Sequence, residues 1–294
     1  MTKLTVSIRH ANRAREITTG LLFILPSLAG SMVFVIIPFF DAIGHSFTDG
    51  FTGAFAGLAY YREIFTNLSF LTAVTNTGRF IALCVPILLV LSLLLALMLT
   101  KPVWNRGALR AAFLLPMAIP VASVALLWQI IFHRNGLINN IMILFGQAPI
   151  DWMKTGWALV CLIVSYIWKN VGYNMVLFIA GLGGIPASLY EAAAVDGAGG
   201  WRQFFSITLP CLKPTLFTVT VLSLLNSFKA YREAYLVAGN YPYGNIYLIQ
   251  HTLNNWFGSL EIEKLSAAAV VVALVIVMLV ALLSRAWSVD AKQM

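Results

Sequence analysis

The chain has 294 residues, of which 60% are hydrophobic and only 10% are charged, and its mean hydropathy is +0.85. This composition excludes an ordinary soluble domain and predicts a multi-spanning membrane protein. The formal net charge of +8 does not indicate a nucleic-acid partner, because the basic residues are scattered around apolar runs and form no single patch.

Six apolar runs have about the length that an α-helix needs to cross ~30 Å of hydrocarbon. We expect an all-α membrane protein, with one transmembrane domain over residues 1–294 and six membrane-spanning helices. The expected spans are about 18–40, 77–100, 111–132, 157–182, 212–238 and 265–284. Pro86, Pro116 and Pro120 lie within these spans and are predicted to kink or locally unwind them.

The fifth span is the weakest, because Lys229, Arg232 and Glu233 interrupt its second half. Lys229 and Glu233 have the i, i+4 spacing that places two side chains on one helix face. This spacing predicts an ion pair between them that neutralises the charge within the membrane.

The positive-inside rule predicts the orientation. Eleven of the nineteen basic residues fall on one side if six spans are counted: Lys3, Arg9, Arg13, Arg15, Lys101, Arg106, Arg110, Arg202, Lys213, Arg285 and Lys292. The expected localisation is therefore the cytoplasmic membrane, with both termini and the segment between the fourth and fifth spans in the cytoplasm. Without the fifth span, the basic tail would lie outside.

The segment Glu191 to Pro210, EAAAVDGAGGWRQFFSITLP, is polar and amphipathic although long apolar runs flank it. Pro186 suits a first helical turn, and Ser188 and Glu191 have the spacing of a capping box. We therefore expect a short helix from about Ala187. It should end in a turn at 196–200, where glycines are poor helix formers. A second helical piece over 201–207 should then carry an apolar face.

The sequence lacks the signatures of common enzymes. It contains no Gly-Lys dipeptide and hence no P-loop, and no HExxH, GxSxG or metal-spaced cluster of histidines and cysteines. The three cysteines, Cys84, Cys161 and Cys211, imply no disulfide framework. We expect neither catalysis nor a bound metal or cofactor, so any transport energy should come from a partner or an ion gradient.

One motif indicates which kind of partner would supply the transport energy. The motif begins with Glu191-Ala192-Ala193, has Gly197 after three further residues, and ends with Ile207-x-Leu209-Pro210 after nine more. It resembles the complete EAA signature of permease subunits of bacterial binding-protein-dependent ABC importers. The first span, the segments LLPMAIPVASVALLWQIIF and IAGLGGIPASLYEAA, and the six-span layout resemble the carbohydrate branch of that family, in particular its maltose-type first permease subunit. We call residues 183–211 the EAA loop.

The resemblance implies a mechanism. The EAA loop would be a coupling helix seated on a cytoplasmic ATPase subunit, with these residues at or near the contact: Glu191, Ala192, Ala193, Asp196, Gly197, Ile207, Leu209 and Pro210. Two ATPase subunits would bind ATP and Mg²⁺. A second related permease subunit and an extracytoplasmic solute-binding protein that delivers sugar would complete the importer. The permease pair could be a heterodimer or a homodimer.

Other interpretations fit parts of the sequence. An amphipathic loop on the membrane surface would explain the aromatic residues of the EAA loop, but not the glycine turn at that spacing. A secondary transporter or channel without an ATPase would need acidic residues inside the membrane, where only Glu233 is available. A structural membrane scaffold would transport nothing.

Polar and aromatic residues within spans are candidates for the sugar path, because an intramembrane polar group is costly unless it faces a cavity or a partner. The candidates are Trp168, Lys169, Asn170, Tyr173, Asn174 and Asn226. The competing interpretation is that these residues join helices through hydrogen bonds or lie in the interfacial aromatic belt.

Overall fold

The computed structural model describes residues 20–100 and 105–291 of the chain, and these residues are predominantly helical. Within these ranges no strand is formed, and β pairing is limited to one isolated bridge between Thr48 and Phe55. The chain divides into two compact units. One comprises residues 1–64 with 261–271, and the other comprises residues 65–260 with 272–294.

The smaller unit begins with a long apolar helix, Gly20–His45. It contains a π-helical turn, η1 (Met32–Ile36), and ends as α2 (Ile37–His45). A turn follows in which Asp49 accepts hydrogen bonds from the backbone N–H groups of Phe51 and Thr52. The Lys264 ammonium group lies 2.6 Å from carboxylate oxygens of both Glu63 and Glu261. The contact with Glu63 connects α3 (Ala59–Thr66) to the start of the last helix within this unit.

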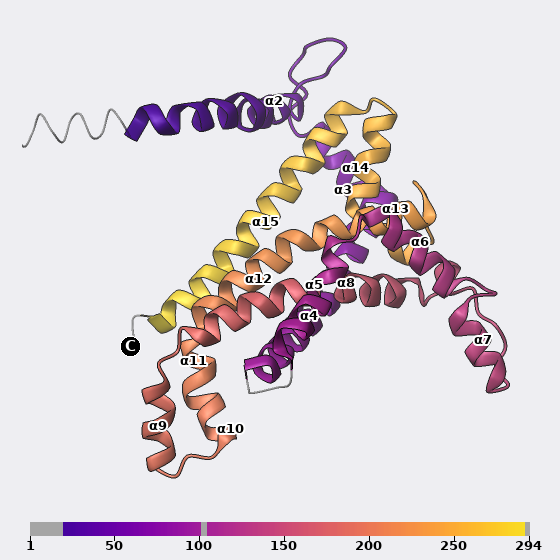
Figure 1. Ribbon diagram of the computed structural model, residues 1–294. Helices are drawn as coiled ribbons and strands as arrows, with labels where there is room; N and C mark the ends of the chain where they lie inside the picture. Colours follow the sequence, from indigo (N-terminus) through magenta and orange to yellow (C-terminus); the bar gives the residue numbers. More distant parts are fainter. Residues whose placement is uncertain (1–19, 101–104, 292–294) are drawn as a thin grey trace, which may run out of the picture. The chain divides into compact units, whose positions relative to one another are not determined.

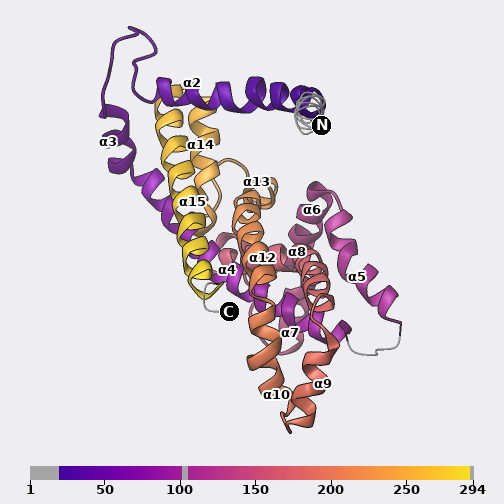
Figure 2. The same cartoon turned by 90° about the vertical axis from the view of Figure 1, so that its left-hand side faces the viewer.

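The larger unit contains most of the other helices (Figures 1 and 2). In chain order they are α4 (Leu68–Thr100), α5 (Arg106–Ala118), α6 (Val121–Phe132), α7 (Leu137–Leu144), α8 (Ala158–Gly183), α9 (Ala187–Val195), α10 (Gly200–Gln203), α11 (Leu209–Cys211), α12 (Lys213–Ser227), α13 (Tyr231–Ala238) and α14 (Ile249–Gly258). The helices α3 (Ala59–Thr66) and α15 (Ile262–Ala291) each contribute to both units.

Five helical segments of the described chain are long and apolar enough to cross a membrane: Gly20–His45, Leu68–Thr100, Val121–Leu144, Ala158–Gly183 and Ile262–Trp287. A sixth span results if Gly200–Cys211 and Lys213–Ala238, which are bent by 66° at Leu212, count as one broken span. The predicted fold class, an all-α membrane protein, is thereby confirmed, and the predicted number of six spans is reached when the bent pair counts as one.

The predicted spans and the helices agree best at α8, which begins and ends one residue later than expected. The helix of the second span, α4, begins nine residues before the expected start and ends at the expected Thr100. It remains helical through Pro86. The final helix is longer than expected at both ends.

The third expected span, 111–132, is two helices and not one. The helix α5 ends at Ala118, and α6 begins at Val121. Between them, Ile119 and Pro120 are extended, with ψ angles of 131° and 141°. A proline disfavours the helical conformation in the residue that precedes it, which explains the break at Ile119. The predicted local unwinding at Pro120 is confirmed, whereas Pro116 lies inside α5.

The core of the larger unit lies where α4 and α8 pack against each other. Phe80 and Leu88 of α4 pack with Leu162 and Tyr166 of α8, and α13 contributes Ala234 to the same cluster. A second cluster joins α4, α8 and α12 around Met175 and Phe178. The two helices that carry the polar candidates, α8 and α12, are therefore held together by apolar packing, and α4 packs against both.

Candidate functional site

The first half of the EAA loop is a helix with a glycine C-cap. The helix α9 ends at Val195, and Gly197 follows with a φ of +74°. The Gly197 N–H donates to the Ala194 carbonyl oxygen at 3.1 Å, and the Ala198 N–H donates to that of Ala193 at 2.9 Å. This pair of hydrogen bonds is a Schellman motif, which requires a residue in the left-handed region at the position of Gly197. The spacing between Glu191-Ala192-Ala193 and Gly197 therefore has a structural cause.

The backbone shape of the second half of the EAA loop is explained by one residue, Pro210. The helix α10 continues into a π-helical turn, η3 (Phe204–Thr208), and the N–H of Leu209 donates to the carbonyl of Phe204, five residues earlier. Pro210 has no N–H and its ring crowds the preceding turn, so a wider turn relieves the conflict. The same arrangement precedes Pro38, where the N–H of Ile37 donates to Met32. The Ile207-x-Leu209-Pro210 pattern thus encodes this widened turn.

The two halves of the loop form a hairpin that projects from α8 and α12 at the end remote from α13 and α14 (Figures 1 and 2). A 2.9 Å hydrogen bond between the hydroxyls of Tyr190 and Thr208 joins its two arms, and the Gln203 side chain donates to the Ala198 carbonyl. The hairpin is therefore held in shape by its own polar contacts.

The tip of the hairpin presents apolar side chains to the outside. Val195 is 89% exposed, Trp201 79% and Phe205 59%, and the rings of Trp201 and Phe205 stack at 6.2 Å. Glu191 and Asp196 are also exposed. A rigid apolar surface rimmed by charge is typical of an interaction site.

One local prediction for this loop was wrong. Ser188 does not cap α9, because the helix begins at Ala187 and Ser188 lies inside its first turn. The N-cap is Pro186, whose ψ of 131° is extended, and no side chain caps the helix. The proline sets the helix start earlier than a capping box at Ser188 requires. The predicted order of helix, glycine turn and second helical piece is confirmed.

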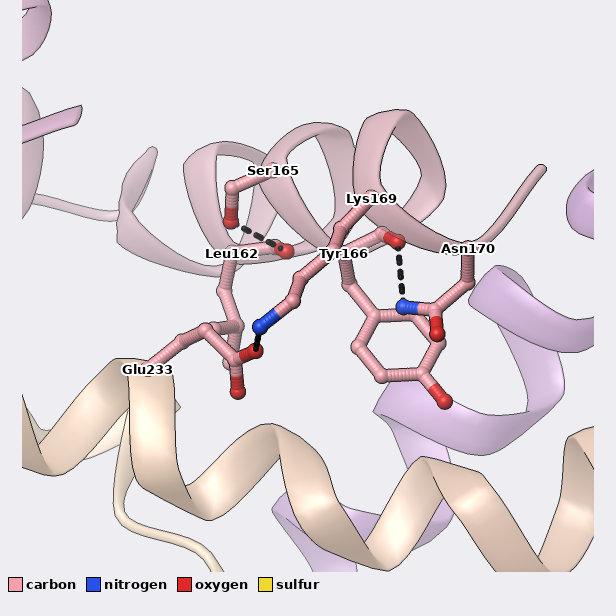
Figure 3. A network of polar contacts seen from close by, with 6 residues as sticks. All are labelled: Leu162, Ser165, Tyr166, Lys169, Asn170 and Glu233. Carbon is pink, nitrogen blue, oxygen red and sulfur yellow. Dashed lines mark hydrogen bonds and ion pairs between the residues drawn. The ribbon is translucent and has the colours of Figure 1, made fainter. Parts of the chain in front are cut away.

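The second candidate region lies between α8 and α13, where Figure 3 shows Glu233 turned toward Lys169. The Lys169 Nζ lies 3.2 Å from the Glu233 Oε1, and both side chains are about nine-tenths buried. The other carboxylate oxygen of Glu233 has no hydrogen-bond partner among the described residues.

The predicted Lys229–Glu233 ion pair is therefore wrong. Lys229 instead donates to the Asn226 Oδ1 at 2.7 Å. The cause is a 3₁₀ turn, η4 (Phe228–Ala230), between α12 and α13. In a 3₁₀ turn the side chains at i and i+3 are aligned, and that at i+4 is rotated away from them. Lys229 and Glu233 consequently point in different directions.

The remaining path candidates divide into two groups. The Asn174 amide is buried and donates to the Ser223 Oγ at 2.7 Å, so it joins α8 to α12. Trp168, Asn170, Tyr173 and Asn226 are partly exposed. The Asn170 amide nitrogen donates to the Tyr166 carbonyl (Figure 3), and Trp168 packs edge-to-face on Trp128 at 5.7 Å. Contact of any of these residues with a substrate stays a prediction.

A family model describes the same architecture. Residues 73–291 match the family of binding-protein-dependent transport system inner membrane components. The chain belongs to this family. It is thus a multi-pass membrane permease.

Named relatives of this permease transport different compounds. The trehalose/maltose transport system permease protein MalF of Thermococcus litoralis is 33% identical over 78% of this chain and 80% of its own length. The arabinooligosaccharides transport system permease protein AraP of Bacillus subtilis is 32% identical over 90% of this chain and 86% of its own length. The sn-glycerol-3-phosphate transport system permease protein UgpA of Yersinia pestis is 30% identical over 87% of this chain and 89% of its own length.

Solved structures support the fold. A bacterial ABC transporter involved in the import of the acidic polysaccharide alginate matches with a TM-score of 0.84 at 23% identity, over 95% of this chain and 98% of that chain. The alginate transporter in complex with a periplasmic protein that holds an alginate pentasaccharide matches with a TM-score of 0.79 at 25% identity, over 93% and 96%. The permease therefore has the fold of an ABC importer permease.

Sequence reasoning missed one surface feature of the permease. An open hollow of about 270 Å³ is lined by Leu68, Ser69, Thr72, Tyr241, Pro242, Gly244 and Tyr247. Asn76 of α4 fixes its floor by donating to the carbonyls of Gly244 and Tyr247. Leu68, Ser69 and Thr72 line it from the first turns of α4, which begins before the expected span.

His251 lies beside this hollow on α14. It is 1% exposed and packs against the rings of Tyr231 and Tyr247. Its Nδ1 accepts the Leu248 N–H at 3.0 Å. Burial lowers the pKa of His251 to about 4, because a charged imidazolium is poorly solvated there. The ring is therefore neutral at neutral pH and supports the loop that carries Tyr247.

The buried ion pair gives a stability prediction. Glu233→Leu leaves the Lys169 ammonium buried without an acid, which costs roughly 3–5 kcal/mol. We expect lower permease abundance in membranes and a lower melting temperature of the detergent-purified complex. Because the double variant Lys169→Met, Glu233→Leu removes both charges, it should recover most of the loss. Equal stability of Glu233→Leu and the unaltered permease would show that the pair does not hold α8 to α13.

Proposed function

We propose that this permease is one membrane-spanning subunit of an ATP-driven importer for a sugar or sugar derivative. Its family membership supports binding-protein-dependent transport. The carbohydrate cargo is supported by relatives named for trehalose/maltose and arabinooligosaccharides. The compounds for which the relatives are named range from neutral sugars to the phosphate ester sn-glycerol-3-phosphate. Sequence similarity therefore supports a sugar or sugar derivative as the cargo, but does not select one compound.

The observation that carries the proposal is the exposed apolar tip of the EAA hairpin. Val195, Trp201 and Phe205 are far more exposed than apolar side chains outside a membrane usually are. In the proposal, the hairpin lies in the cytoplasm, as do both termini, and docks in a cleft of an ABC ATPase subunit. Glu191, Asp196 and Gly197 lie at or near this contact, and Ile207, Leu209 and Pro210 shape the second arm.

The proposed cycle needs no catalytic residue in this chain. Two ATPase subunits bind ATP and Mg²⁺ and close, and their movement is transmitted through the hairpin to α8 and α12. The spans then alternate between inward-facing and outward-facing arrangements as rigid bodies. A solute-binding protein delivers the sugar from outside, and a second related permease subunit supplies the other half of the path. Trp168, Lys169, Asn170, Tyr173, Asn174 and Asn226 remain the path candidates from this chain.

A secondary transporter is a weaker proposal. Ion coupling requires an acidic residue that can change its charge during transport. Among the described residues of the helices α4 to α8, α12 and α13, Glu233 is the single acidic residue, and it is paired with Lys169. The family membership also favours a transporter driven by a separate ATPase.

The test is reconstitution. The tagged permease should co-purify with an ATP-hydrolysing subunit and a second permease, as identified by mass spectrometry. In proteoliposomes that contain this complex, sugar-loaded binding protein should stimulate ATP hydrolysis and sugar uptake. Uptake that continues after removal of the ATPase subunits would contradict the proposal, as would purification of the chain alone with full transport activity.

A further inference from the structure

The fifth span carries a basic face that is not packed against the rest of its unit. Asn226 lies at the end of α12, Lys229 in the 3₁₀ turn η4 and Arg232 at the start of α13. They follow one another at intervals of three residues, which a 3₁₀ turn places on the same side. Lys229 and Arg232 are exposed and Asn226 is half-buried, whereas Glu233 and Ala234 on the other side are buried. The turn thus separates the two cations of this segment from its single acid.

No acidic side chain of the described structure neutralises these cations. The Lys229 ammonium donates to the Asn226 Oδ1, and Arg232 has no hydrogen bond or ion pair with any described residue. Glu233 lies next to Arg232 in sequence, but its carboxylate faces Lys169 across the α8–α13 contact. The described helices α4 to α8, α12 and α13 offer no other acid.

Two unpaired cations within a membrane span require an explanation. Charged groups within a membrane-spanning segment are costly, so they normally face a water-filled path or a partner and mark the route of the transported ion or solute. Asn226 adds an amide N–H group to the same face, since its oxygen already accepts from Lys229. The whole face therefore offers mainly hydrogen-bond donors.

We propose that this face binds the acidic group of an anionic sugar, which is a carboxylate or a phosphate, as it passes through the permease. This inference rests on the proposed function and names its cargo. Arg232 supplies the planar pair of N–H donors that matches a carboxylate or phosphate. Lys229, held by Asn226, supplies a second positive charge one turn away.

A neutral sugar fits this face less well. Each sugar hydroxyl both donates and accepts hydrogen bonds, so a site for a neutral sugar gains from acceptors as well as donors. Here the nearest carboxylate in the chain sequence, that of Glu233, is directed away from the face, toward Lys169. Two cations without an acid would remain unneutralised around a neutral cargo, whereas an anionic cargo neutralises them.

A depletion experiment identifies the cargo class. Cells with the complete importer and cells that lack this permease are given a mixed digest of neutral and acidic polysaccharides together with sugar phosphates, and mass spectrometry follows what disappears. We expect the depleted compounds to be anionic, and their masses distinguish carboxylates from phosphates. Depletion of neutral sugars alone would overturn this inference and leave the proposed importer intact. The absence of any permease-dependent depletion would overturn both.

Variants then test the residues. Arg232→Gln should raise the KM for the depleted anion by about 10- to 100-fold, as expected for the loss of a charge-assisted hydrogen bond. Arg232→Lys should recover part of the loss, because it restores the charge but not the paired donors. Arg134→Gln, which removes an exposed loop charge, is the matched control and should leave the KM unchanged. The inference fails if Arg232→Gln leaves the KM unaltered or if it acts only by releasing the second permease subunit, since Arg232 would then pair with an acid of that subunit.

Discussion

Gly172→Ala is expected to prevent the permease from assembling. Gly172 lies on α8 at its contact with α5, and a Cβ atom there would overlap the backbone carbonyl oxygen of Phe113. Small residues let membrane helices approach this closely. Because a backbone carbonyl cannot rotate away as a side chain can, the two helices must separate. We expect a cost of about 3 kcal/mol or more, the upper range for an overpacked core.

The same helix provides matched controls. A Cβ atom at Gly183 would meet no neighbouring atom within 4 Å, so Gly183→Ala should be neutral. At Gly181 the obstacle is the Thr215 side chain, which can move, so Gly181→Ala should have an intermediate effect. Membrane abundance, recovery of the complex and melting temperature check the series. If Gly172→Ala melted at the temperature of Gly183→Ala, the close contact of α5 with α8 would be wrong.

The importance of Gly172 shows one limit of sequence reasoning. The apolar run that forms α8 predicted its ends to within one residue, because length and hydropathy are local properties. A glycine inside such a run carries no local sign of which helix backbone will lie against it. Its role depends on α5, which is far away in the sequence.

The ion pair between Lys169 and Glu233 shows a second limit of prediction from sequence. Lys169, Asn226, Lys229 and Glu233 stand out in the sequence as polar residues within spans, but the predicted Lys229–Glu233 pair assumed a regular α-helix through the fifth span. One 3₁₀ turn at 228–230 changed the partner of Glu233 from Lys229 to Lys169. Such a short turn has no strong sequence signature.

The EAA loop was predicted better because each of its turns depends on a residue with special backbone properties. Gly197 permits a positive φ, and Pro210 removes an N–H from the helix. The error at Ser188 arose because Pro186 also governs the helix start. Glycine and proline therefore made the hairpin predictable. The apolar face expected over 201–207 is also present, and the fold adds the exposed Val195 to it.

Gly197→Pro is expected to uncouple the importer while the spans still fold. Proline fixes φ near −65°, whereas Gly197 has a φ of +74°. Proline also lacks the N–H that Gly197 donates to Ala194. Both arms of the hairpin must then be reoriented, which moves Val195 and Trp201 relative to each other. Because Gly197 is exposed and outside the apolar core, membrane abundance should change little.

The expected result is a permease that reaches the membrane but loses its ATPase subunits during purification and shows at least about a tenfold fall in sugar uptake, since coupling requires the docked hairpin. Gly199→Ala is the control, because Gly199 has a φ of −68° and open space around its Cβ position. It should retain both the ATPase subunits and uptake. Normal ATPase recovery and uptake by Gly197→Pro would refute the proposed coupling role. Equal losses in Gly199→Ala would mean that the loop is sensitive to any substitution, and that the left-handed turn at Gly197 has no special part in docking.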